Sequence, residues 1–202
     1  MALRPIRVLA VCAGVGGFEL GLARALRRRG LASRVVCYLE REVTAALVLA
    51  ARMADGSLDH APIWSDVRSF DGRPWRGRVD CVAGGIPCQP WSLAGKRLGA
   101  ADTRDLVNDF VRVVSQVLPA LVLVENTPGF VGAWRERRVP GLTRLAIGLS
   151  ELAYYVEDPV LVRASDVGAP HKRERVFVLA HRDGGGLAGL GLSVEAGQRR
   201  AP

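Results

Sequence analysis

Short apolar runs alternate with segments of helical periodicity along most of this chain, and this alternation constrains the fold more than any other feature. Short apolar runs are typical of buried strands, whereas apolar residues at i, i+3, i+4 and i+7, such as Val43, Ala46, Leu47 and Ala50, indicate a helix. The predicted strands are residues 6–12, 35–39, 79–83, 121–124, 155–162 and 175–180, and the predicted helices are residues 17–29, 42–53, 105–117 and 141–153. This order favours a mostly parallel α/β sheet with helices on both faces.

The composition excludes several other classes of protein. With 202 residues, of which 49% are hydrophobic and 24% charged, the chain can bury a core and is too apolar to be disordered. No apolar run reaches the roughly 20 residues that span a bilayer, and the N-terminus lacks the apolar core of a signal peptide. We therefore expect one domain in a cytoplasmic protein with no membrane partner.

The charge permits a nucleic-acid partner without requiring one. Lys and Arg total 28 against 20 Asp and Glu, a formal net charge of +8, and 26 of the basic residues are Arg. The guanidinium group matches two phosphate oxygens at once, which suits nucleic acid. Codon bias in a GC-rich genome produces the same excess of Arg, so both interpretations stay open.

Glycine and acidic residues follow the first three apolar runs. The first strand leads into Ala13-Gly14-Val15-Gly16-Gly17-Phe18, where glycine lets the backbone approach a ligand, although a tight packing turn has the same composition. Glu40 ends the second strand, where an acid either binds ribose hydroxyls or stabilises the start of a helix. Asp66 and Val67 follow a third run, and a lone Asp of this kind is usually a turn residue. Together, the three strand ends predict a nucleoside cofactor lying across the sheet.

The four cysteines fall into two groups. Cys12, Cys37 and Cys81 lie in apolar runs that are typical of buried free thiols. Cys88 lies between two prolines in a rigid polar turn after a predicted strand. No C-x-x-C spacing occurs and the three histidines are scattered, so we expect no metal site.

The stretch from Gly84 to Arg97 reads Gly-Gly-Ile-Pro-Cys-Gln-Pro-Trp-Ser-Leu-Ala-Gly-Lys-Arg and is the most informative in the chain. Its basic residues, with Arg104 beyond them, are suited to contacts with phosphates. Glu125 ends the strand 121–124 and is expected at the same sheet edge. A thiol opposite a carboxylate predicts covalent catalysis on a ring that is protonated as it is attacked. A papain-like pair of Cys88 with His171 is a weaker alternative, because no matching nucleophile signature is present.

These motifs resemble the cytosine-5 DNA methyltransferases. The match comprises the Gly-rich turn, the Pro-Cys-Gln loop, Asp102-Thr103-Arg104, Glu125-Asn126 and Pro170-His171-Lys172-Arg173-Glu174-Arg175, in the order and spacing of that family, over residues 6–180. The resemblance implies a Rossmann-like S-adenosylmethionine-dependent methyltransferase fold, an α/β fold whose mostly parallel sheet has seven strands.

The resemblance also implies a reaction and a role for each motif. The Cys88 thiolate would add to C6 of a flipped-out cytosine in DNA, so that C5 can accept the methyl group of S-adenosylmethionine. Glu125 would hold N3 and the exocyclic amine, while Arg173 and Arg175 would support the O2 side and the catalytic carboxylate. The residues implied to border the methyl donor are Ala13, Gly14, Gly16, Gly17, Phe18, Glu40, Asp66, Val67, Gly85 and Pro87. Those implied to contact nucleic acid are Gln89, Ser92, Lys96, Arg97 and Arg104.

The chain also departs from the family pattern. Cys12 and Arg41 stand where the family usually has aromatic residues against the adenine of the cofactor, which predicts weaker adenine contacts. Residues 181–202 are Gly-rich and are interpreted as a tail, a linker or a stump. We expect residues 1–180 to be the catalytic domain, without a target-recognition region or the C-terminal segment that completes the cofactor pocket.

Two hypotheses about function remain. The first is a prokaryotic or phage-like methyltransferase, active alone or with a second chain or segment that carries target recognition, and associated with the nucleoid through DNA. Its substrate is DNA or, as in one branch of the family, tRNA. The second is a non-catalytic accessory or split subunit that binds donor or nucleic acid, and this hypothesis predicts binding that is insensitive to the loss of Cys88.

Overall fold

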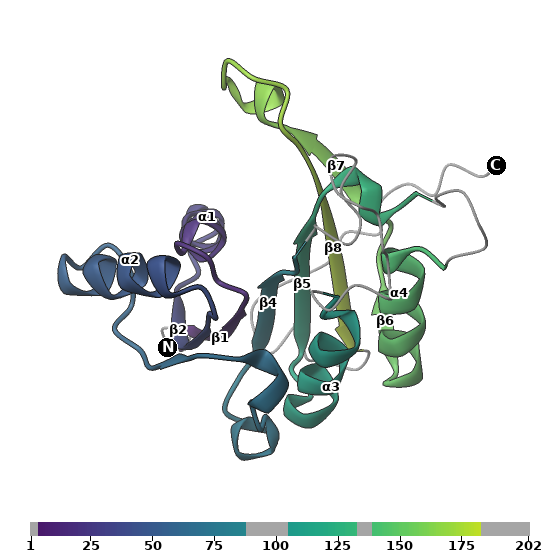
Figure 1. Ribbon diagram of the computed structural model, residues 1–202, viewed down its shortest axis with the longest axis horizontal. Coiled ribbons are helices and arrows are strands. Elements are labelled where there is room, and N and C mark those ends of the chain that lie inside the picture. The colour runs from purple at the N-terminus through teal and green to yellow at the C-terminus, as the bar shows by residue number, and fades with distance from the viewer. Residues whose placement is uncertain (1–3, 88–104, 133–138, 183–202) are drawn as a thin grey trace.

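Eight strands form one sheet in the computed structural model, which describes residues 4–87, 105–132 and 139–182 (Figure 1). The strands are β1 (Ile6–Val11), β2 (Ser33–Leu39), β3 (Ile63–Trp64), β4 (Cys81–Gly85), β5 (Leu121–Asn126), β6 (Tyr154–Val156), β7 (Val160–Arg163) and β8 (Glu174–Arg182). The helices are α1 (Gly17–Arg28), α2 (Val43–Ala54), α3 (Val107–Val117) and α4 (Gly141–Glu151), with short 3-10 turns η1 (Val67–Ser69), η2 (Arg73–Trp75), η4 (Pro128–Phe130) and η5 (Ala164–Val167). The predicted α/β class is confirmed.

The order of the strands creates a reversal at the centre of the sheet. The order is β3-β2-β1-β4-β5-β8-β6, with β7 also paired to β8. Strands β1 to β5 are parallel, whereas β8 is antiparallel to β5. Because the chain adds β2 and β3 on one side of β1 and then returns to the other side with β4, the carboxyl ends of β1 and β4 flank a point where such sheets bind ligands. The register aligns these ends, since Val11 pairs with Gly84, and Gly85 pairs with Glu125.

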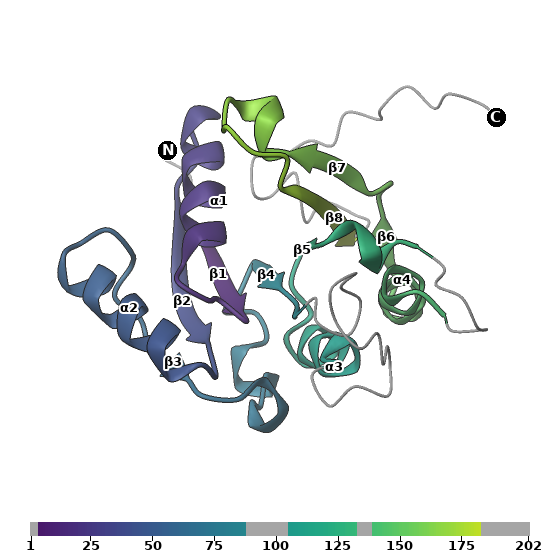
Figure 2. The ribbon, with the colours of Figure 1, turned by 45° about the horizontal axis from the view of Figure 1, so that its top comes forward.

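Two helices cover each face of the sheet (Figures 1 and 2). Leu26 of α1 and Leu49 of α2 join the core on one face, and Phe110 of α3 and Leu145 of α4 join the core on the other. Alternate side chains of β1 enter opposite cores, as expected of a strand that is covered on both faces. The predicted arrangement of helices on both faces is confirmed.

The apolar stripe that predicts a helix faces the core in α3 but not in α2. In α3, Phe110, Val113 and Val117 are fully buried. In α2, Val43 and Leu47 are 70% and 66% exposed, and the fully buried side chain is Leu49. Because α2 is apolar on nearly every side, the i, i+3, i+4 spacing identifies the helix without identifying its buried face.

Two predicted boundaries change. Residues 155–162 form two strands, β6 and β7, which both pair with β8. Pro159 lies between them and has no N–H to donate to the ladder. This division and the two-residue strand β3, which is not among the six predicted strands, give eight strands, one more than the seven that the resemblance implies. Strand β8 continues to Arg182, two residues into the segment predicted to be tail, where the Arg182 N–H donates to the Ala120 carbonyl.

Candidate active site

A cavity of about 680 Å³ lies at the carboxyl edge of the sheet, which is a typical size for a small-ligand site. The ends of β1, β2, β4 and β5, the residues around η1 and the residue before α3 form its wall. The predicted residues that line it are Glu40, Asp66, Val67, Gly85, Pro87, Glu125 and Arg175. Residues more than 100 positions apart therefore meet at one edge, as the strand-end argument predicts.

The turn after β1 needs glycine for two different reasons. Gly16 has φ +79°, and a Cβ at this position would lie 2.4 Å from Cδ1 of Leu58. Gly14 has φ +56°, and its N–H donates to the Glu40 carboxylate at 2.7 Å. The turn is therefore fixed by backbone conformation, by packing and by a hydrogen bond to the neighbouring strand end.

The other predicted residues of this turn, Ala13, Gly17 and Phe18, do not line the cavity. Ala13 is buried, Gly17 begins α1, and the ring of Phe18 lies 6.0 Å from the ring of Phe177 on β8. The residue that precedes this turn, Cys12, does line the cavity, and its backbone has a left-handed conformation with φ +53°. The contacts of these residues with a donor stay predictions.

Glu40 connects two parts of the cavity wall. One carboxylate oxygen accepts the N–H of Gly14 and the other accepts the N–H of Glu42, each at 2.7 Å. Glu42 is the residue immediately before α2. Glu40 therefore stabilises both the glycine turn and the start of a helix, which is one of the two roles that its position predicts.

Asp66 and Val67 form another part of the cavity wall. The Asp66 carboxylate accepts the N–H of Arg68 at 3.0 Å and caps η1, as expected of a turn Asp. Its second oxygen lies 3.7 Å from the Arg68 guanidinium. Val67 is buried and lines the cavity with its neighbours.

The end of β4 approaches the acidic end of β5 closely. A Cβ at Gly84 would lie 2.7 Å from Cε2 of Phe110, so any residue larger than glycine at this position would displace the Phe110 ring or α3. A Cβ at Gly85 would lie 3.5 Å from Oε2 of Glu125. The described chain continues to Pro87 at the cavity wall. The predicted residues Cys88, Gln89, Ser92, Lys96, Arg97 and Arg104 lie outside the described residues.

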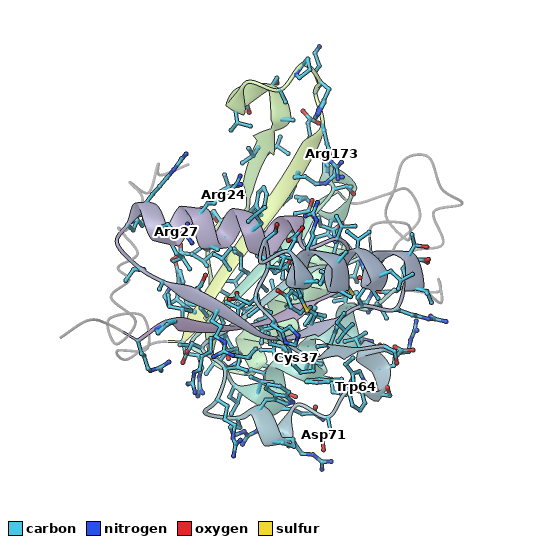
Figure 3. All side chains as sticks on the ribbon, turned by 90° about the vertical axis from the view of Figure 1, so that its left-hand side faces the viewer. Arg24, Arg27, Cys37, Trp64, Asp71 and Arg173 are labelled. Carbon is cyan, nitrogen blue, oxygen red and sulfur yellow. The ribbon has the colours of Figure 1, made fainter. Side chains whose placement is uncertain are left out.

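Glu125 is held by Arg175, but Arg173 does not reach it. Arg175 Nε lies 2.5 Å from Glu125 Oε1, and both side chains are about one quarter exposed. Arg175 Nη1 also donates to the Glu174 carbonyl at 2.8 Å. Arg173 lies just before β8, on an exposed part of the hairpin formed by β7 and β8 (Figure 3). Its side chain has no hydrogen bond or ion pair with the residues described here. The ion pair orients one carboxylate oxygen and leaves the other facing Gly85.

Asn126 is a site residue to which the sequence argument gives no role. Its side chain is 2% exposed; its amide donates to the Ile86 carbonyl at 3.2 Å, and its amide oxygen accepts the Thr127 N–H at 2.8 Å. These bonds join the end of β5 to the chain that leaves β4, two residues before Cys88. In the sequence, only its position next to Glu125 points to this role of Asn126. The partner of its amide is the Ile86 backbone carbonyl, which leaves no side-chain motif to recognise.

The described cysteines are poor candidates for a nucleophile. Burial raises the pKa of Cys12 and of Cys81 to about 12, and that of Cys37 to about 11. At Cys12, the neighbouring carboxylates Glu40 and Asp66 contribute to this rise, although burial is its largest cause. Since the thiolate is the reactive form, these three thiols are unreactive near neutral pH.

No group of three or more His, Cys, Asp or Glu side chains in residues 4–87, 105–132 and 139–182 is arranged to hold a metal ion. In the same ranges, none of the helices has both the length and the apolar character needed to cross a membrane.

The fold and the cavity define a Rossmann-like α/β methyltransferase domain. The parallel core, the reversal between β1 and β4, the glycine turn and the acidic strand ends are its defining features. Residues 6–197 match the family described as C-5 cytosine-specific DNA methylase. The chain belongs to this family.

Individual relatives agree with the assignment. The chain is 32% identical over 181 residues to type II methyltransferase M.Eco47II of Escherichia coli, covering 87% of this chain and 39% of that protein. It is 34% identical over 172 residues to type II methyltransferase M.NgoMIV of Neisseria gonorrhoeae, covering 85% and 50%. A solved prophage-encoded protein of E. coli, assigned as a DNA modification methyltransferase, superposes with a TM-score of 0.67 at 27% identity, covering 94% and 49%. The chain thus spans half or less of the length of each of these proteins.

Proposed function

We propose that this chain carries the donor-binding and catalytic part of an enzyme that transfers a methyl group from S-adenosylmethionine to C5 of a flipped-out cytosine in DNA. Residues 1–180 form the catalytic domain in this proposal. The observation that carries the proposal is the Glu125–Arg175 ion pair, which holds a carboxylate beside Gly85 at the strand end that leads to Cys88.

The cavity suits the proposed donor in size and in charge. S-adenosylmethionine supplies an electrophilic methyl group on a positively charged sulfur when it is bound. The cavity wall carries four carboxylates, Glu40, Glu42, Asp66 and Glu125, against three guanidinium groups, Arg41, Arg68 and Arg175, and this small excess of negative charge favours such a cation. Each Glu40 oxygen accepts one hydrogen bond in the described structure, and a carboxylate oxygen has a second lone pair for a ribose hydroxyl.

Cys88 and Glu125 divide the chemistry on the base. The Cys88 thiolate forms a bond to C6, and the electron pair of the C5–C6 double bond makes C5 nucleophilic. Glu125 hydrogen-bonds to N3 and the exocyclic amine and so stabilises the protonated ring. Arg175 orients Glu125, while Arg173 supports the O2 side of the base. C5 would then form a bond to the methyl carbon of the donor as the methyl–sulfur bond breaks and S-adenosylhomocysteine leaves. Loss of the C5 proton to a base and expulsion of the Cys88 thiolate would restore the C5–C6 double bond and aromaticity.

The enzyme must also contact the DNA around the target cytosine. Inside a stacked duplex the ring cannot be reached, so the cytosine must be flipped out. Gln89, Ser92, Lys96, Arg97 and Arg104 contact the nucleic acid around the flipped base, with the basic side chains on phosphates. A further segment or a second chain supplies target recognition, in line with the greater length of the relatives.

The test is transfer of label from radiolabelled S-adenosylmethionine to unmethylated DNA of mixed sequence, with unmodified tRNA as a parallel substrate. We expect label in DNA with the wild-type protein and none with Cys88→Ala or Glu125→Gln. Cys37→Ala is the matched control, because it removes a buried thiol away from the cavity and should retain transfer.

Each alternative outcome has a distinct meaning. Label that persists in Cys88→Ala would contradict the covalent mechanism. Label in tRNA alone would change the substrate. Binding of S-adenosylhomocysteine without any transfer would contradict catalysis by this chain alone and would favour an accessory or split subunit.

A further inference from the structure

The turn that brings Asp66 to the cavity wall depends on another element for part of its hydrogen bonding. Residues 66–70 contain Asp66, Val67 and Arg68, which line the cavity, and a single short 3-10 turn, η1. Within this turn, the Ser69 N–H donates to the Asp66 carbonyl and the Phe70 N–H donates to the Val67 carbonyl, both at 3.2 Å. These two bonds satisfy carbonyls at the start of the turn, whereas the carbonyls of Arg68 and Phe70 receive donors from outside it.

Arg112 of α3 supplies these partners. Its Nη2 donates to the Val67 carbonyl at 2.6 Å and to the Arg68 carbonyl at 3.2 Å, and its Nη1 donates to the Phe70 carbonyl at 2.8 Å. One guanidinium therefore holds three carbonyl groups within residues 67–70, and two of them, those of Val67 and Arg68, belong to residues that line the cavity. The planar fork of Arg provides this geometry, whereas the single ammonium of Lys does not.

The helix that carries Arg112 is itself rigidly placed. Phe110, Val113 and Val114 are fully buried on its inner face. Phe110 lies directly under Gly84 of β4, where an added Cβ would approach its ring to 2.7 Å. Helix α3 thus contacts the strand end that leads to Cys88 and, through Arg112, fixes the wall that bears Asp66.

A second arginine, Arg76, contacts the same helix from outside and offers a matched comparison. Arg76 lies after η2, outside the cavity wall, and its guanidinium donates to the carbonyls of Gln116 and Ser115 at the end of α3. Both arginines connect α3 to the chain between β3 and β4. Only Arg112 holds residues that line the cavity.

We propose that Arg112 is a positioning residue for the methyl-donor site, acting through the backbone of residues 67–70. The inference rests on the proposed function, because it assumes that the cavity binds the donor. Without the guanidinium, Val67, Arg68 and Phe70 lose their shared donor, and the wall segment that bears Asp66 is no longer tied to α3.

The experiment measures binding of S-adenosylhomocysteine by calorimetry and binding of a duplex DNA by fluorescence anisotropy. For Arg112→Ala, we expect the Kd for S-adenosylhomocysteine to rise about tenfold or more, the effect of losing one good hydrogen bond to a charged group. Arg112→Lys should give an intermediate value. Arg76→Ala should bind S-adenosylhomocysteine like the wild type, and all variants should bind DNA within about twofold of it.

Hydrogen exchange of the ligand-free protein separates positioning from a general loss of stability. We expect Arg112→Ala to exchange faster in residues 66–70, with the inner strands β1, β4 and β5 unchanged, and Arg76→Ala to leave residues 66–70 protected. Equal loss of donor affinity in both variants, or unchanged affinity in Arg112→Ala, would overturn the assignment of Arg112. A wild-type protein that binds no S-adenosylhomocysteine would instead contradict the donor site of the proposed function and, with it, this inference.

Discussion

Among single residues, Glu19 is the most exceptional. It lies in the first turn of α1, is 4% exposed, and neither carboxylate oxygen has a hydrogen-bond partner in the described structure. Burial, with a smaller contribution from the nearby Glu40, raises its pKa from the ordinary 4.5 to about 7. The side chain is therefore neutral in the folded protein under mildly acidic conditions and is forced to ionise as the pH rises.

The linkage between this proton and folding gives a prediction for Glu19→Gln. Between pH 4.5 and about 7 the folded state binds the proton and the unfolded state releases it, so stability falls as the pH rises through this window. The shift corresponds to about 3 kcal/mol. We expect Glu19→Gln to be more stable than the wild type by about 2 to 3 kcal/mol at pH 8 and similar to it at pH 5.

Urea unfolding followed by tryptophan fluorescence at the two pH values measures this difference. Glu151→Gln is the control, because Glu151 is an exposed residue at the end of α4 and its replacement should change stability little at either pH. Equal gains for the two variants, or a gain for Glu19→Gln that does not depend on pH, would show that ionisation of Glu19 is not the cause.

At the scale of elements, the contact between the ends of β4 and β5 depends on Asn126. Replacement by Ala leaves the Ile86 carbonyl and the Thr127 N–H without their partner in a buried place. We expect Asn126→Ala to lower the free energy of unfolding by about 1 to 3 kcal/mol. In labelled-methyl transfer, the maximal rate should also fall, because the chain that leads to Cys88 loses its anchor.

The other Asn in the sequence provides the comparison. Asn108 lies on the exposed side of α3 and accepts a hydrogen bond from Arg144 at 2.8 Å. Asn108→Ala should change stability by no more than about 0.5 kcal/mol and should leave the maximal rate unchanged. If the two variants have the same effect, the cross-strand contact of Asn126 is not what holds the site.

These elements also show what the sequence could predict. The alternation of strands and helices, the buried face of α3 and the meeting of Glu40, Asp66 and Glu125 at one edge follow from periodicity and from the geometry of parallel strands. The orientation of α2 could not be predicted, because its composition is apolar on nearly every side. The role of Arg112 was equally hidden, because its partners are backbone carbonyls, which no side-chain motif encodes.

At the scale of the whole molecule, positive charge lies at both edges of the sheet. The chain has a net charge of +8. Arg28 ends α1, which runs back from the carboxyl edge, so it lies at the amino edge, away from the cavity. Lys172 lies on the hairpin between β7 and β8, close along the chain to Arg175 of the cavity wall. Figure 3 shows the same separation between Arg27 on α1 and Arg173 on the hairpin.

This separation predicts which charges DNA will use. Each phosphate that is neutralised contributes about −0.9 to the slope of log affinity against log salt. If DNA approaches the cavity edge, Lys172→Gln should make the slope less steep by about one, whereas Arg28→Gln, which removes the same charge, should leave it unchanged. With at least three phosphate contacts, the wild-type affinity should fall about 40-fold between 50 and 200 mM salt. Anisotropy titrations of one labelled duplex across this range give all three slopes. Equal changes in the two variants would mean that DNA responds to net charge alone, and a larger change in Arg28→Gln would place DNA at the opposite edge from the cavity.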